Sequence, residues 1–234
     1  MTKGSQKMHD IQMNFIISSD VKLRFPKLRV LTCRISDVKV RKQDTELENF
    51  KNELINSIKT QYNLDSLKDA ASFRAYRDFF WRIGVDPTKN RPAAEALIRR
   101  ILRGENLPRI NTLVDAYNLA SIKTEIALAA FDADELKGNL LMRLAETGAE
   151  FMGIGMSKPM ILQGNEVVIS DEEKLVAVYP HRDAEDMKVT ELTRNALLLI
   201  CGVLGISEKS LRNAAHMTIE FITRFCGGEG RVIE

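Results

Sequence analysis

The strongest constraint on the fold is a change in hydrophobic spacing near residue 140. Before it, apolar residues recur at three- and four-residue intervals, the period of amphipathic helices. After it, short apolar runs alternate with turn residues, as expected for strands. A last helical pattern starts at Ser207 and closes at Gly227 and Gly228. Helices, then strands, then a returning helix, with no Gly-, Ser- or Pro-rich linker, predict a single α+β domain.

The individual elements follow from the same patterns. Asp44 is placed to cap a helix, while Pro92 and Gly104 mark the ends of another. The first 12 residues are polar, so we expect a flexible segment there and a domain over residues 13–234. In the first half we expect strands over 13–18 and 30–40, helices over 44–59, 72–84, 92–104 and 111–123, and a strand ending near 132. In the second half the expected strands are LLMRLA, EFMGIG, EVVIS, KLVAVYP, and MKVT through NALLLICGV.

Composition narrows the class of protein. A hydrophobic fraction of 44% and a charged fraction of 28% are ordinary for a globular chain. The three cysteines are far apart and odd in number, which predicts buried reduced thiols in a cytoplasmic protein. No apolar run is long enough for a signal core or a membrane span. No phosphate-binding glycine loop, zinc pattern or nucleophile elbow is present, so we expect no cofactor and no metal.

Charge is unevenly placed along the chain. The net charge of +2 divides into +4 over residues 1–73, +5 over residues 74–109 and −7 over residues 110–234. A basic block beside an acidic half indicates one polyanion-facing region on a protein that is not basic throughout. The alternative is a chance fluctuation of surface charge without a partner.

The first candidate site is the polar string inside TLVDAYNLAS. Asp115 and Asn118 are three residues apart and therefore share one face of the expected helix. An Asn side chain has both donors and an acceptor, so it can orient a hydroxyl, a water or an amide. The alternative is that both are ordinary capping or surface residues.

The second candidate site is HRDAEDMKVT, which follows an apolar strand directly. Its polar residues crowd a strand end, where functional groups often sit: His181, Arg182, Asp183 and Glu185. The alternative is a solvated charged turn.

Both strings carry a resemblance to a known family. RINTLVDAYN resembles a stretch of the bacterial phenylalanyl-tRNA synthetase beta subunit that reads roughly Arg-x-Ile-Asn-Asn-Val-Val-Asp-x-Thr-Asn. AAFD resembles its His-Ala-Phe-Asp, and TRN its Thr-x-Asn. Glu185 precedes Thr193 by the spacing that separates the family's Gly-Gly-Glu from that Thr. The chain thus looks like a free-standing form of the tRNA-binding and editing domain, B-three/B-four, most strongly over residues 72–203.

This resemblance implies a fold and a site. The fold would be α+β in three layers, with a central β-sandwich of unusual topology flanked by helices. The site would hydrolyse wrongly charged aminoacyl-tRNA in trans, with Asn118 and Glu185 carrying the chemistry in one cleft. Ala129 stands where the family has His, which favours RNA binding over hydrolysis. Within the two polar strings, the residues expected to contact the substrate are Asp115, Tyr117, His181, Arg182 and Asp183.

The same resemblance makes tRNA or aminoacyl-tRNA the expected partner, with no membrane involved. The basic helices would contact RNA phosphates, and an aromatic ring would be available for stacking. Two alternatives remain: a non-catalytic RNA-binding adaptor, and a small-molecule or amino-acid binding protein that reuses the pocket. The residues expected to contact RNA are Arg74, Arg77, Trp81, Arg99, Arg100 and Arg103.

Overall fold

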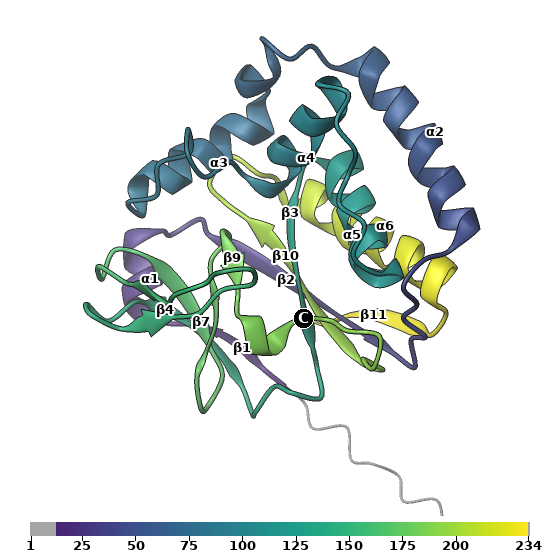
Figure 1. The fold of residues 1–234 in the computed structure, drawn as a ribbon. Coiled ribbons are helices and arrows are strands. Elements are labelled where there is room, and N and C mark those ends of the chain that lie inside the picture. The colour runs from purple at the N-terminus through teal and green to yellow at the C-terminus, as the bar shows by residue number, and fades with distance from the viewer. Residues whose placement is uncertain (1–12, 234) are drawn as a thin grey trace, which may run out of the picture.

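Two β-sheets face each other, and helices cover the outer face of one of them (Figure 1). The computed structural model describes residues 13–233, so the flexible segment expected over residues 1–12 lies outside the described residues. The layers are a five-stranded sheet, a four-stranded sheet and a helical layer. The expected α+β class, with a β-sandwich at its centre, is confirmed.

The four-stranded sheet is antiparallel throughout and has the order β11-β2-β10-β3. Its strands are β2 (Arg29–Ser36), β3 (Ala127–Asp132), β10 (Ala196–Gly202) and β11 (Glu229–Ile233). The five-stranded sheet has the order β1-β4-β7-β8-β9, with β1 parallel to β4. Its strands are β1 (Phe15–Ile17), β4 (Leu140–Leu144), β7 (Val167–Ser170), β8 (Leu175–Val178) and β9 (Arg182–Asp183). A separate pair joins β5 (Glu150–Phe151) to β6 (Met160–Ile161).

The helices are distributed unevenly over the sandwich. The helices α5 and α6 lie against the four-stranded sheet, and α2 packs outside them (Figure 1). Helix α1 and most of α3 bury their apolar residues in the core between the two sheets, while Phe73 of α3 joins the core against the helices. The bounds are α1 (Ser19–Arg24), α2 (Thr45–Gln61), α3 (Ala71–Arg82), α4 (Ala93–Leu102), α5 (Thr112–Thr124) and α6 (Glu208–Cys226), with 3-10 turns at Leu67–Asp69 and Glu185–Met187.

Strand β10 joins the two hydrophobic cores. All of its residues are buried. Leu198 and Ile200 face the helices, while Leu197 and Leu199 face the other sheet. A strand buried on both faces reads as a continuous apolar run without alternation. Such a run cannot be told from a buried helix by its pattern alone. The structure confirms that it is a strand.

Several local expectations are confirmed and others are wrong. The Asp44 side chain caps α2 by accepting from Leu47 N at 3.0 Å. The three cysteines are buried free thiols. The expected strand at MKVT is instead a 3-10 turn followed by loop, and EFMGIG forms only the short strand β5 before a loop. Helix α1 and strand β11 were not predicted. Within residues 13–233, no helix combines the length and the hydropathy needed to cross a membrane.

Candidate functional site

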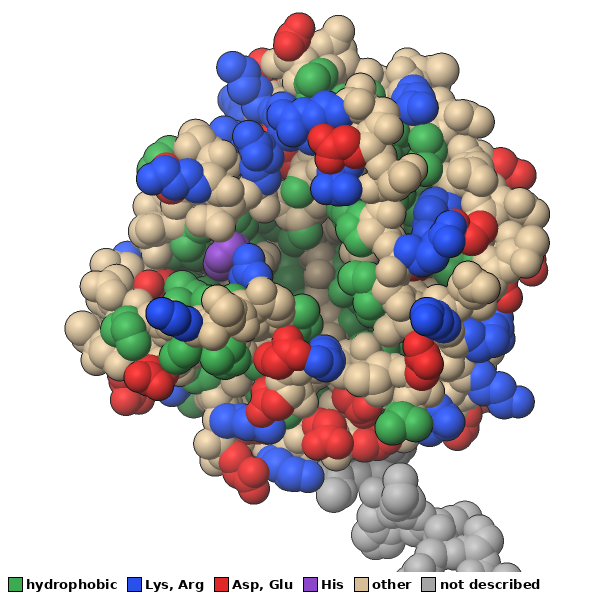
Figure 2. Space-filling view, in the orientation of Figure 1, with side chains coloured by type: hydrophobic (Ala, Val, Ile, Leu, Met, Phe, Trp, Pro, Cys, Tyr) green, Lys and Arg blue, Asp and Glu red, His purple; other side chains and the backbone are tan. Residues whose placement is uncertain are grey.

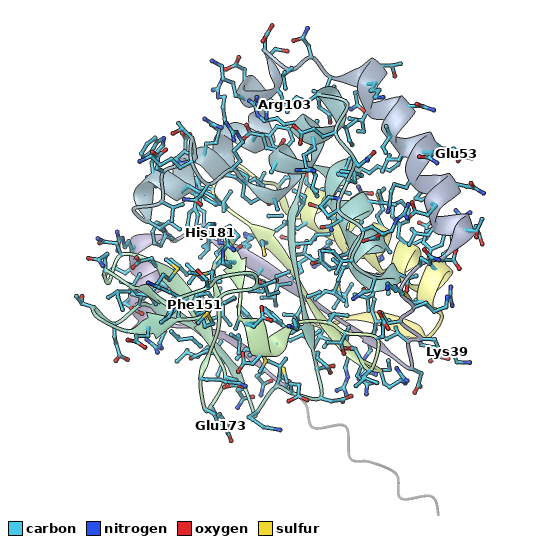
Figure 3. All side chains as sticks on the ribbon, in the orientation of Figure 1. Lys39, Glu53, Arg103, Phe151, Glu173 and His181 are labelled. Atoms are coloured by element: carbon cyan, nitrogen blue, oxygen red, sulfur yellow. The ribbon has the colours of Figure 1, made fainter. Side chains whose placement is uncertain are left out.

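A cavity of about 260 Å³ opens between the two sheets, next to α5. Strands β3 and β10 form one wall, and β7, β8 and β9 form the other. Figure 2 shows a hollow on this face with apolar side chains inside it and a histidine at its rim. That histidine is His181, which Figure 3 places on the connection before β9. The apolar walls come from strands: Leu128, Ala129, Ile169, Ala177, Val178, Leu199 and Cys201.

The cavity brings the two polar strings together, although they are far apart in sequence. Helix α5 presents one pair of polar side chains, and the β8–β9 connection presents the other group. Ala129, the position at which the resembled family has His, also lines the cavity. The expected site residues that meet here are Tyr117, Asn118, His181, Arg182 and Asp183. The apolar wall was missed by sequence reasoning, because a buried strand residue carries no signal that it faces a cavity.

Asp183 is the carboxylate among the residues that line the cavity. Burial raises the pKa of Asp183 to about 7, although the backbone N–H of Ala130 and the charge of Arg182 act in the opposite direction. A carboxyl group with such a pKa exchanges protons near neutral pH. It can therefore accept a proton in a general-base step.

Two side chains that line the cavity with Asp183, those of Tyr117 and His181, are kept uncharged by their surroundings. Burial raises the pKa of the Tyr117 hydroxyl, and the charge of Asp183 raises it further. Burial, together with the charge of Arg182, lowers the pKa of His181 to about 4. The His181 ring packs edge-on against Phe80, with 5.9 Å between the ring centroids. At neutral pH, Tyr117 is therefore a hydroxyl donor and His181 an uncharged imidazole.

Glu185 lies outside this cavity. Its carboxylate pairs with Lys188 and accepts from Gly155 N at 3.2 Å. Both contacts lower the pKa of Glu185, the Lys188 hydrogen bond most. The residue lines a separate open groove, with its side chain 41% exposed. The expectation that Glu185 shares a cleft with Asn118 is therefore not met, because its two partners hold it towards the loop after β5.

Asp115 also lies away from the cavity lining. It forms a buried ion pair with Lys51 of α2, with Nζ 2.8 Å from Oδ2. Its other oxygen accepts from Ile110 N at 3.0 Å. Lys51 also pairs with Glu48 at 2.7 Å. The side chain that was expected to contact substrate instead connects α5 to α2.

The positive charge of the basic helices α3 and α4 is partly neutralised by a carboxylate. Glu95 of α4 is fully buried, and it accepts from Arg77 at 3.0 Å and from Arg99 at 2.8 Å. Arg99 was expected to contact RNA, but its side chain is only 14% exposed. A buried carboxylate requires such partners. The Arg77–Glu95 pair therefore holds α3 against α4, and Arg99 adds a second partner for Glu95 within α4.

Other members of the predicted RNA-binding set are accessible. Arg74 is exposed, and Trp81 is 58% exposed. Arg100 donates to the carbonyl of Asn106 and pairs with Glu105, and its side chain still reaches solvent. Arg103 lies at the end of α4, as Figure 3 shows. Figure 2 shows Lys and Arg side chains gathered above the hollow, over α3 and α4. The cavity thus opens beside a basic surface. Across residues 13–233, no three His, Cys, Asp or Glu side chains converge in a way that would hold a metal ion.

Comparison with known proteins decides the family. The family model of the B3/4 domain matches residues 75–227. The chain belongs to the B3/4 domain family. It is 26% identical over 161 residues to the phenylalanine–tRNA ligase beta subunit of Bartonella henselae, covering 59% of this chain and 20% of that protein. It is 28% identical over 144 residues to the Fusobacterium nucleatum beta subunit, covering 61% and 17%. The chain thus spans about a fifth of the length of these relatives.

A solved structure shows the same fold. The N-terminal fragment of the phenylalanyl-tRNA synthetase beta subunit from Pyrococcus horikoshii superposes with a TM-score of 0.51 and 13% identity. The match covers 99% of this chain and 53% of that fragment. The similarity in fold therefore extends beyond the residues that the family model matches.

Proposed function

We propose that this B3/4 domain binds aminoacyl-tRNA in the cytoplasm and hydrolyses the ester of wrongly charged tRNA in trans. The observation that carries this proposal is a cavity that combines Asn118 and Asp183 and opens beside a basic surface. Relatives of the chain are phenylalanine–tRNA ligase beta subunits. A domain related to part of a tRNA ligase has a polynucleotide as a natural partner.

The size of the cavity favours an aminoacyl group as the occupant. Its volume of about 260 Å³ lies below the range of roughly 300–1,000 Å³ that is common for drug-sized ligands. An amino acid side chain with its ester carbonyl fits a cavity of this size, while the terminal nucleotide stays outside. The phosphates that follow it would lie against the accessible arginines of α3 and α4.

The proposed reaction is attack of a water molecule on the ester carbonyl. Asn118 orients the water or the carbonyl oxygen, since its amide both donates and accepts. Asp183 removes a proton from the water as the new C–O bond forms, and passes that proton to the ribose oxygen as the ester C–O bond breaks. An aminoacyl ester is already activated, so positioning and one general base are sufficient.

The test is a deacylation assay with a panel of correctly and wrongly charged tRNAs. We expect the protein to hydrolyse a subset of them. Changing Asp183→Asn keeps the shape of the side chain and removes the base, so the rate should fall by about 100-fold or more while tRNA affinity is retained. A protein that binds tRNA without deacylating any member of the panel would be the non-catalytic adaptor.

A second candidate function is binding of an amino acid or another small molecule without RNA. The neutralisation of Arg77 and Arg99 by the buried Glu95 favours it, because it weakens the basic surface. Measurement of tRNA binding at several salt concentrations separates the two candidates. Binding that is absent even at low salt, together with binding of free amino acids, would establish this second function.

A further inference from the structure

The loop of residues 152–156, called the mouth loop below, lies against the segment that carries the polar end of the cavity. Ile154 N donates to the carbonyl of Asp183 at 2.9 Å. Glu185 N donates to the carbonyl of Met152 at 3.0 Å. The backbone of the mouth loop is thus tied to the β9 segment at its first residue and at its central residue.

The Glu185 side chain adds a further contact to the same loop. One carboxylate oxygen accepts from Gly155 N at 3.2 Å, and the other pairs with Lys188. Gly153 lies so close to Arg182 that an added Cβ would fall 2.3 Å from the Cδ of that side chain. Arg182 also donates to the carbonyl of Ile154 at 2.9 Å. The mouth loop therefore packs directly against Arg182 and Glu185.

Ile154 is the residue of the mouth loop that reaches the cavity. It lines the cavity, and 40% of its surface is exposed. A large apolar side chain in this position is available to contact whatever enters. The neighbouring Met152 instead lines the separate groove beside Glu185. The contacts of Glu185 with the loop therefore fix the position of one wall of the cavity entrance.

We propose that Ile154 determines the size of the amino acid side chain that the cavity admits, and that Glu185 is the positioning residue that holds Ile154 there. This inference rests on the proposed function, since it names what selects among aminoacyl esters. It assigns Glu185 no contact with the substrate. What matters about Glu185 is its hydrogen-bond acceptor to Gly155, and a Gln in its place keeps an acceptor of nearly the same shape.

The first experiment measures the docking of the mouth loop without any ligand. Hydrogen exchange at the amide of Gly155 is compared in the wild-type protein, Glu185→Ala and Glu185→Gln. We expect exchange about fivefold faster in Glu185→Ala, the factor that corresponds to loss of one hydrogen bond. Glu185→Gln should stay close to wild type. The matched control is Asp186→Asn, a neighbouring carboxylate that pairs with Lys174.

The second experiment measures deacylation of alanyl-tRNA and tyrosyl-tRNA by the same variants and by Ile154→Ala. Widening the entrance by Ile154→Ala should raise the ratio of kcat/KM for the larger tyrosyl substrate over the alanyl substrate by about tenfold. This is the scale of the effect of a small change in pocket size. Glu185→Ala should shift the ratio in the same direction. Glu185→Gln and Asp186→Asn should leave it within about twofold of wild type.

The outcomes separate this inference from the proposed function. A wild-type protein that deacylates neither these two substrates nor any other member of the panel would contradict the proposed function, and the specificity claim with it. An active wild type whose ratio is unchanged by Ile154→Ala would overturn this inference alone. So would a Glu185→Gln variant that slows both substrates as strongly as Glu185→Ala, because the charge and not the acceptor would then be required.

Discussion

At the scale of single residues, Asp183 shows how burial changes the pKa of a carboxyl group and, through it, the stability of the fold. Its pKa is raised to about 7 in the folded protein, against an ordinary value of 3.8. Below about pH 4 the carboxyl is neutral in both folded and unfolded states and does not affect stability. As pH rises towards 7, the folded state keeps the proton that the unfolded state releases. Above pH 7 the half-buried carboxylate is ionised in both states and destabilises the fold.

The direction of this change of stability with pH gives the first prediction. Asp183→Asn removes the charge and should raise the free energy of unfolding at pH 8 by about 1–2 kcal/mol, with little change at pH 4. Urea denaturation of both proteins at the two pH values measures the difference. A change of the same size at both pH values would mean that ionisation of Asp183 is not the cause.

The second prediction uses two neighbouring alanines on β3. Ala129 lines the cavity, whereas Ala130 belongs to the core against the helices. Ala129→His should therefore keep the free energy of unfolding within about 1 kcal/mol of wild type, while Ala130→His overpacks the core at a cost of about 1–3 kcal/mol or more. Chemical denaturation of both variants gives the comparison. Equal losses would show that the cavity does not have room for an imidazole.

At the scale of elements, the arginines of α3 and α4 divide into two groups. Arg77 and Arg99 are bound to the buried Glu95, while Arg100 and Arg103 reach solvent. The hydrophobic spacing of α4 correctly predicts its buried stripe. It does not reveal Glu95 on the inner side, because recognising a buried carboxylate requires knowing that α3 supplies its partner.

The third prediction follows from this division. Changing Arg100 and Arg103 to Ala should weaken tRNA binding and reduce the slope of log K against log salt by about 2. Arg99→Ala should mainly lower stability, because it removes a partner of a buried carboxylate. Filter binding across a salt series, with thermal denaturation in parallel, measures both effects. An unchanged salt slope in the double variant would remove this part of α4 from the interface.

At the scale of the whole molecule, the sequence predicts what depends on local pattern. The class of fold, the main helices, the cap at Asp44 and the strand β10 all follow from spacing and capping chemistry. The resemblance predicted that Asn118 shares a cleft with Glu185, whereas in the structure Asp183 lines the cavity with Asn118. The two polar strings are brought together only by the tertiary fold. The position of the Glu185 side chain could not be predicted from sequence spacing, because it depends on Lys188 and on the amide of Gly155. Neither partner is visible as a pattern in the sequence.

The last prediction concerns cooperativity. Strand β10 supplies adjacent residues to both cores: Leu198 to the core against the helices and Leu199 to the core between the sheets. Because one strand belongs to both, neither core can lose its packing without disturbing the other. We therefore expect residues 13–230 to unfold as one unit, with the fluorescence of Trp81 and the far-UV circular dichroism changing together in urea.

The matched variants Leu198→Ala and Leu199→Ala test this directly. Each should lower the free energy of unfolding by about 2–5 kcal/mol, and in each the two signals should still coincide. Trp81 lies on α3 next to Phe79 and Phe80, which pack in the core between the sheets. If the cores were independent, Leu199→Ala would shift the Trp81 transition and Leu198→Ala would leave it in place. Two stable fragments after limited proteolysis would also indicate independent cores, because a strand shared by both cores cannot be divided between separately folded halves.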